Sequence, residues 1–155
     1  MKVLQILPQL NIGGVERGTL DLSKALIQKG HESFVISGGG ILVDELIQSG
    51  AKHYEIPVHI KSLRTLSLAK NLSKTISFID PDIVHVRSRM PAWVNFRAFK
   101  MLQKKPLLIS TFHGLYSFPI YSQVMSFVDH SIAISKTVEK YILKNYKLNK
   151  GDITV

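Results

Sequence analysis

Short apolar runs alternate with longer amphipathic stretches along the whole chain. The short runs have the length and the continuous hydrophobicity of strands that are buried on both faces of a sheet. We predict strands at residues 3–7, 33–37, 53–56, 83–86, 107–111, 131–134 and 153–155, the last of them cut short.

The stretches between these runs carry the three- and four-residue spacing of amphipathic helices. We predict helices at residues 15–29 and 41–49, another before the fourth strand, one that begins near Pro91, and one from the N-cap Ser135 to about Tyr146. The helix before the fourth strand has a buried stripe made of Leu66, Ala69, Leu72, Ile76 and Ile79. The first helix is expected to cover the sheet with Leu22, Ala25 and Leu26.

Strands that alternate with helices predict a parallel sheet with helices on both faces, and right-handed crossovers make such a sheet doubly wound. The predicted fold class is therefore α/β. We find no linker, internal repeat or low-complexity segment, and we expect one domain that spans residues 1–155.

Composition narrows the class of protein. The chain has 155 residues, of which 45% are hydrophobic and 20% charged, as in a globular domain. No apolar run approaches the roughly 20 residues that span a bilayer, and residues 1–8 are too short for a secretory signal. The chain has no Cys, so it has no disulfides and no Cys-based metal site. We expect a cytoplasmic protein.

The formal net charge is +9. Such a charge suits nucleic acid, an anionic membrane surface or a phosphorylated small molecule, and it is equally consistent with solvated helix faces. Trp93, Phe96 and Phe99 recur at helical spacing and are expected in the core rather than on a platform for RNA bases. No nucleic-acid partner is therefore predicted.

The first strand-to-helix loop contains Gly13 and Gly14. Ligands of open α/β sheets bind beyond the carboxyl ends of the strands. Two glycines at a helix start let a ligand approach the backbone, where free N–H groups and the helix dipole favour an anion. A tight turn that needs glycine explains the pair equally well.

Several nucleotide- and metal-binding patterns are missing. The first loop lacks G-x-G-x-x-G, and the second strand ends without an acidic residue, which argues against a dinucleotide-binding dehydrogenase. Residues 38–40 form a Gly triplet without a following Lys-Ser or Lys-Thr, so they are no P-loop, and we expect a flexible connection there. No His-x-x-x-His pair or carboxylate cluster suggests a metal, and no cofactor is predicted.

Two other loops carry candidate chemistry. Arg87 and Arg89 follow the fourth strand and could hold a phosphate or a carboxylate, although an exposed pair without a ligand is the alternative. His113 follows the fifth strand and precedes Gly114, so it is well placed to meet a ligand, while a structural role stays open.

Four segments, in this order and at this spacing, resemble the N-terminal domain of glycosyltransferase family 4, a group of retaining enzymes with the GT-B fold. They are VLQILPQLNIGGVERGTLDLSKALIQKGHES, DPDIVHVRSRMPAW, ISTFHGLYS and VDHSIAISKTVEKYI. Together they extend over essentially the whole chain. The resemblance implies a Rossmann-like, doubly wound sheet that forms the N-terminal half of a GT-B enzyme. The HVRSR stretch further suggests a bacterial enzyme of cell-envelope glycan biosynthesis.

The resemblance also implies an activity. The family transfers a sugar from a nucleotide-sugar to an acceptor hydroxyl, generally without a metal, and here the acceptor would be a glycan or a lipid-linked molecule. His113 would be the catalytic residue, touching the transferring sugar or orienting the acceptor. The implied substrate-binding residues are Gly13, Gly14, Glu16, Arg87, Arg89 and Gly114.

The family's C-terminal donor domain carries most nucleotide contacts, including a Glu-x7-Glu motif, and the chain stops before it. A donor domain or a separate partner chain is therefore expected, and residues 1–155 alone are expected to be inactive. An excised domain, a truncated gene product and half of a split enzyme remain open. The alternative function is a non-catalytic basic α/β module that binds a phosphorylated ligand or a partner protein. The charge also suggests peripheral association with the inner face of an anionic membrane.

Overall fold

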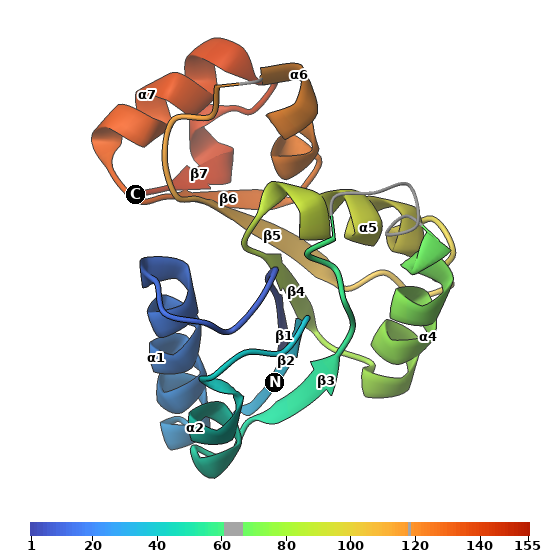
Figure 1. The fold of residues 1–155 in the computed structure, drawn as a ribbon. Coiled ribbons are helices and arrows are strands. Elements are labelled where there is room, and N and C mark those ends of the chain that lie inside the picture. The colour runs from blue at the N-terminus through green and yellow to red at the C-terminus, as the bar shows by residue number, and fades with distance from the viewer. Residues whose placement is uncertain (61–66, 118) are drawn as a thin grey trace.

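A single parallel sheet organises the chain in the computed structural model, which describes residues 1–60, 67–117 and 119–155 (Figure 1). The sheet has seven strands in the order β3-β2-β1-β4-β5-β6-β7, with neighbours paired in parallel. The strands are β1 Lys2–Ile6, β2 Glu32–Ser37, β3 Lys52–Glu55, β4 Ile83–Val86, β5 Leu107–Phe112, β6 His130–Ala133 and β7 Ile153–Thr154. All the predicted strands are confirmed, with shifts of at most one residue at their ends.

The predicted helices are also confirmed. They are α1 Gly14–Gln28, α2 Val43–Gln48, α4 Ala69–Ile79, α5 Arg89–Phe99 and α7 Lys136–Asn145. Ser135 caps α7 as expected, because its Oγ accepts a hydrogen bond from the Val138 amide at 3.3 Å. Leu66 of the predicted stripe lies outside the described residues. A short helix α6 Pro119–Ser122 and the 3-10 turns η1 Gln123–Ser126 and η2 Lys150–Asp152 were not predicted.

Helices cover both faces of the sheet, as the alternation predicts. In Figure 1, α1 and α2 lie on one side of the strands and α4 and α5 on the other. A small core joins α1 and α2 to the sheet around Leu20, Val35 and Leu46. A larger core lies on the other face and takes in α4, α5 and α7. The fold is a three-layer Rossmann-like α/β sandwich.

The face of α1 that covers the sheet differs from the predicted one. Ala25 is exposed, whereas Thr19, Leu20 and Ser23 are buried. The Gln5 side-chain amide donates hydrogen bonds to the Thr19 carbonyl oxygen at 3.1 Å and to Ser23 Oγ at 3.0 Å. A hydrogen-bonded polar side chain can be buried without a penalty, and a search for apolar periodicity cannot detect it.

The predicted flexible connection at residues 38–40 is wrong. Its backbone is hydrogen-bonded to the loop after β1: the Gly38 amide donates to the Pro8 carbonyl at 2.9 Å, and the Leu10 amide donates to the Gly39 carbonyl at 2.8 Å. The Leu42 amide continues the contact by donating to the Leu10 carbonyl at 2.9 Å. These bonds hold the loop that leads to α1.

We expect Gly40→Ala to destabilise the domain. Gly40 has φ of 142°, and a Cβ there would overlap the backbone of Leu10. Strained backbone of this kind costs about 1–3 kcal/mol, which urea or thermal denaturation of the chain would measure. Gly151→Ala is the matched control, because a Cβ at Gly151 meets no atom within 4 Å. A Gly40→Ala variant as stable as this control would contradict the prediction.

Candidate functional site

The candidate site lies where the strand order changes direction. From β1 the chain proceeds to β2 on one side, while β4 lies on the other side of β1. The loops that follow β1 and β4 therefore diverge, and ligands of open α/β sheets bind in the resulting crevice. The Arg87 amide donates to the Ile6 carbonyl at 3.0 Å, which fixes the two strand ends beside each other.

The two glycines of the first loop differ in what surrounds them. Gly13 is the N-cap of α1, and a Cβ at this position would overlap the carboxylate of Glu16, which folds back over the helix start. Gly14 begins the helix, and a Cβ there would meet nothing within 4 Å. The φ of Gly13 is 175°, an extended conformation that any residue adopts, and Gly14 has no positive φ. Backbone conformation therefore does not explain the pair.

Arg87 is buried at the carboxyl end of β4, with 7% of its surface exposed. Its Nη1 donates a hydrogen bond to Gln5 Oε1 at 2.8 Å, and its Nε has no partner among the described residues. A Cβ at Gly18 would lie 3.1 Å from Arg87 Nη2, so this glycine leaves room for the guanidinium. Burial lowers the pKa of Arg87 to about 10, against the opposing effect of the Glu16 charge. Arg87 is therefore a buried cation at neutral pH.

Two histidines complete the site. His85, within β4, is hydrogen-bonded through Nε2 to Thr111 Oγ1 at 2.7 Å, and its buried Nδ1 has no partner in the described chain. His113 follows β5, and its buried Nε2 likewise has none. Burial and the nearby Arg87 lower the pKa of His85 to about 3 and that of His113 to about 4. Both imidazoles are neutral at pH 7 and can exchange hydrogen bonds with a ligand.

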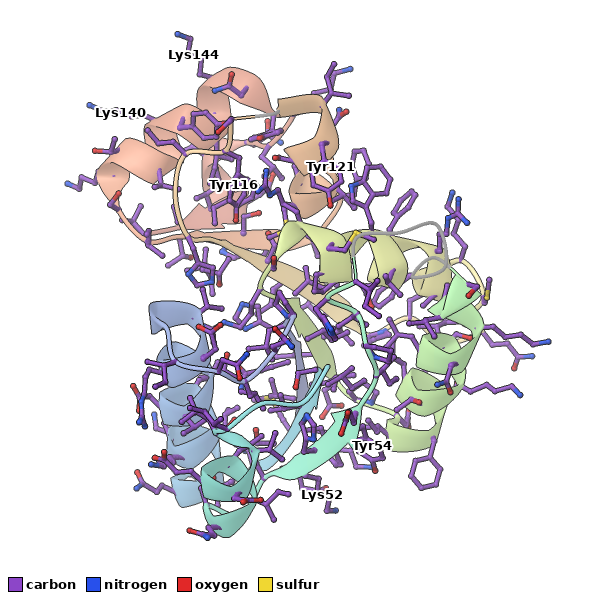
Figure 2. The ribbon with its side chains drawn as sticks, viewed as in Figure 1. Lys52, Tyr54, Tyr116, Tyr121, Lys140 and Lys144 are labelled. Carbon is purple, nitrogen blue, oxygen red and sulfur yellow. The ribbon has the colours of Figure 1, made fainter. Side chains whose placement is uncertain are left out.

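Arg89 lies apart from Arg87. Its guanidinium stacks 4.8 Å from the ring centre of Tyr116 and 5.5 Å from that of Tyr121, two side chains in the upper half of the molecule (Figure 2). Its Nη1 donates to Ser122 Oγ at 3.4 Å. The two arginines are therefore neither an exposed pair nor a single anion clamp.

Gly114, which follows His113, has open space where a Cβ would be.

The prediction that the aromatic residues of α5 lie in the core is only partly right. Trp93, Phe96 and Phe99 are half-buried on α5, whose fully buried positions include Ala92, Val94 and Ala98. The helix presents its small residues to the sheet and its aromatic residues toward its flank.

The sequence interpretation missed Gln5, Gly18, His85 and Thr111. Gln5 and His85 stand inside otherwise apolar strands, and a polar residue in such a run is buried with a partner more often than not. That signal was available in the sequence. Gly18 and Thr111 give no comparable signal, because their importance comes from the atoms that lie against them.

The described ranges contain no group of three or more His, Cys, Asp or Glu side chains that could hold a metal ion. Within the same residues, no helix has the length and hydrophobicity that crossing a membrane requires.

The chain is similar to proteins of known family and structure. The family model described as Glycosyltransferase Family 4 matches residues 12–155. A glycosyltransferase from Rickettsia africae is 36% identical, with a TM-score of 0.82 over 99% of this chain and 42% of that protein. No curated protein matches the chain.

Two further solved structures share the fold at lower identity. The lipopolysaccharide outer core galactosyltransferase WaaB is 19% identical, with a TM-score of 0.77 over 100% of this chain and 45% of WaaB. Anabaena HepE in complex with UDP and glucose is 15% identical, with a TM-score of 0.77 over 100% of this chain and 44% of HepE. This chain therefore spans less than half of each of the three proteins.

We expect the domain to lose stability as the pH falls from about 6.5 toward 5. Burial lowers the pKa of His53, His85 and His113 below the ordinary value of 6.5. Between the lowered and the ordinary value the unfolded chain binds more protons, so acid favours unfolding, and the full stability is present above pH 6.5.

The buried His85 alone would contribute up to about 1.4 kcal/mol per pH unit in this window. Urea denaturation at a series of pH values measures the slope, and His85→Gln should make it shallower whatever its absolute stability. Equal slopes for wild type and variant would show that His85 does not titrate on unfolding.

Proposed function

This chain belongs to Glycosyltransferase Family 4, and we propose that it forms the N-terminal, acceptor-side domain of a retaining glycosyltransferase. The enzyme transfers a sugar from a nucleotide-sugar to a cell-surface glycan or glycolipid. The Rickettsia africae glycosyltransferase supports the class of reaction. HepE, which binds UDP and glucose, and WaaB, a lipopolysaccharide galactosyltransferase, support the donor and acceptor classes through a shared fold.

The donor side of the site comes from a second domain or from a partner chain, and residues 1–155 alone are inactive. Coverage of less than half of each related protein supports this division. In this arrangement the N-terminal half contributes only the groups at the carboxyl edge of its own sheet.

The proposal rests mainly on buried polar groups without hydrogen-bond partners at the switch point of the sheet, the place between β1 and β4 where the strand order changes direction. Arg87 Nε and His113 Nε2 are buried without partners in the described chain, and the space over Gly14 is open. Buried polar atoms are nearly always satisfied in a complete site, so a ligand is the natural partner for these two.

Each residue then has a role. Gly14 lets the donor diphosphate approach the start of α1, where the helix dipole favours negative charge. Arg87 holds an anionic group of the donor or acceptor through charge-assisted hydrogen bonds. The neutral imidazole of His113 donates a hydrogen bond to the transferring sugar or orients the acceptor. Glu16 remains a substrate-binding residue in this proposal, because its carboxylate lies over Gly13 at the same helix start and can accept hydrogen bonds from hydroxyl groups.

Kinetics of the full-length enzyme with His113→Ala test this assignment. If the imidazole contacts the sugar more strongly in the transition state than in the ground state, kcat should fall while KM changes little. We expect kcat/KM to drop by roughly 10²-fold, which corresponds to about 2.7 kcal/mol.

The matched control is His31→Ala, at a position that precedes β2 and so lies at the opposite edge of the sheet. Near-parental kcat/KM for a normally folded His113→Ala enzyme would make His113 structural and refute its assignment.

We also propose that the domain associates with the inner face of an anionic membrane, where a glycolipid acceptor is located. Lys140 and Lys144 project from α7 into solvent at the top of the molecule (Figure 2). Each basic residue near such a surface contributes about 1 kcal/mol. Sedimentation with anionic vesicles should show binding that salt weakens and that Lys140→Glu with Lys144→Glu reduces. Equal binding to neutral vesicles would contradict the electrostatic account.

A further inference from the structure

The flank of α5 contains a pocket of about 370 Å³ whose surface is mostly apolar. Its lining residues are Met90, Trp93, Phe96, Arg97, Lys100 and Tyr121. A volume of this size falls within the roughly 300–1,000 Å³ of small-molecule sites. Ile120, which precedes the lining residue Tyr121 in α6, has 87% of its surface exposed.

The wall of the pocket is fixed by its own contacts. Trp93 Nε1 donates a hydrogen bond to the Tyr121 carbonyl oxygen at 2.9 Å, and the Tyr121 hydroxyl donates to Met90 Sδ at 3.3 Å. The rings of Trp93 and Phe96 meet edge to face, 6.0 Å apart. The pocket is therefore preformed, and a ligand would not have to order these side chains on binding.

Positive charge surrounds the apolar wall. Lys100 Nζ lies 4.4 Å from the ring centre of Phe96, and Arg97 lines the same pocket from the next turn of the helix. The lining includes no acidic residue among the described residues, and neither cation forms an ion pair there. An occupant with a hydrocarbon part and an anionic group would match both features.

The pocket is connected to the candidate site by a row of stacked side chains. Arg89 bridges the rings of Tyr121, in the pocket wall, and Tyr116. Tyr116 belongs to the loop after β5, three residues beyond His113. A molecule whose chain lay in the pocket and whose polar end extended past Arg89 would therefore present that end toward His113.

We propose that this pocket holds the hydrocarbon chain of an anionic amphiphile, and that Arg89, Arg97 and Lys100 attract its negatively charged group. We identify this amphiphile as the acceptor itself, a sugar joined to a lipid chain through a phosphate, and this identification rests on the proposed function. The pocket then acts as an anchoring subsite that sets the distance between the lipid chain and the hydroxyl that receives the sugar.

The experiment uses Trp93, the single tryptophan of the chain, as its reporter. Decyl phosphate is titrated, below its critical micelle concentration, into the chain of residues 1–155 while Trp93 fluorescence is recorded. We expect a saturable blue shift, because the indole loses contact with water. Inorganic phosphate alone should give no shift, and decanol should bind about fivefold more weakly for want of the charge.

Two matched pairs of variants locate the binding. Phe96→Asp places a charge in the apolar wall and should weaken decyl phosphate binding at least about tenfold, whereas Phe78→Asp alters a phenylalanine of α4 that is already 78% exposed and should leave it unchanged. Lys100→Glu should weaken binding about fivefold, whereas Lys29→Glu, at the exposed end of α1 on the opposite face of the sheet, should not. Circular dichroism checks that each variant is folded.

The proposal is overturned if decyl phosphate causes no saturable shift, if Phe96→Asp and Phe78→Asp bind it equally well, or if decanol binds as tightly as decyl phosphate. A shift that appears only with anionic vesicles would also overturn it, because the face would then dock on a bilayer rather than hold one chain. None of these outcomes depends on sugar transfer, so the pocket can fail while the kinetics of His113→Ala still support the proposed function.

Discussion

The buried guanidinium of Arg87 anchors a hydrogen-bond network that connects three strands and a helix at the centre of this domain. It donates to Gln5 in the neighbouring strand, Gln5 donates to Ser23 of α1, and Ser33 of β2 donates to the same Ser23 hydroxyl at 3.0 Å. This network links β4, β1, α1 and β2 at the point where the strand order reverses. Burying a charge costs several kcal/mol unless hydrogen bonds offset it. The geometry of the two loops at the switch point therefore depends on keeping this network intact.

The same arginine sets the electrostatics of the candidate site. Its charge adds to burial in lowering the pKa of His85 and His113, so the imidazoles remain neutral beside a fixed cation. Arg87 therefore carries the positive charge of the site, and the two histidines provide its neutral hydrogen-bonding groups. Glu16 contributes the opposing negative charge from the first turn of α1. A site built in this way attracts an anion through Arg87 while its histidines exchange hydrogen bonds with uncharged groups such as sugar hydroxyls.

Prediction from sequence succeeded where residues close together in the chain determine the local structure. The strands from β1 to β7 and the cap at Ser135 follow from local apolar runs and from one short-range hydrogen bond. It failed where burial depends on partners far along the chain. The polar face of α1 is buried because Gln5 bonds to it, and residues 38–40 are fixed because the backbone around Leu10 lies against them. The half-buried Trp93 of α5 belongs to the same class, since its hydrogen-bond partner Tyr121 in α6 is 28 residues away.

The sequence by itself determined the order of strands and helices, the doubly wound α/β class and the family, because periodicity and short motifs are local properties of the chain. It also placed Gly14, Arg87 and His113 at strand ends, and the carboxyl ends of parallel strands share one edge of a sheet. Only the tertiary structure decided which of these groups meet. Arg87 is buried against Gln5 and Gly18, whereas Arg89, two residues later, stacks on tyrosines at the flank of the domain. The reason is that Arg87 directly follows β4 whereas Arg89 begins α5, and the neighbours of each side chain are set by the packing of distant segments rather than by the sequence around each arginine.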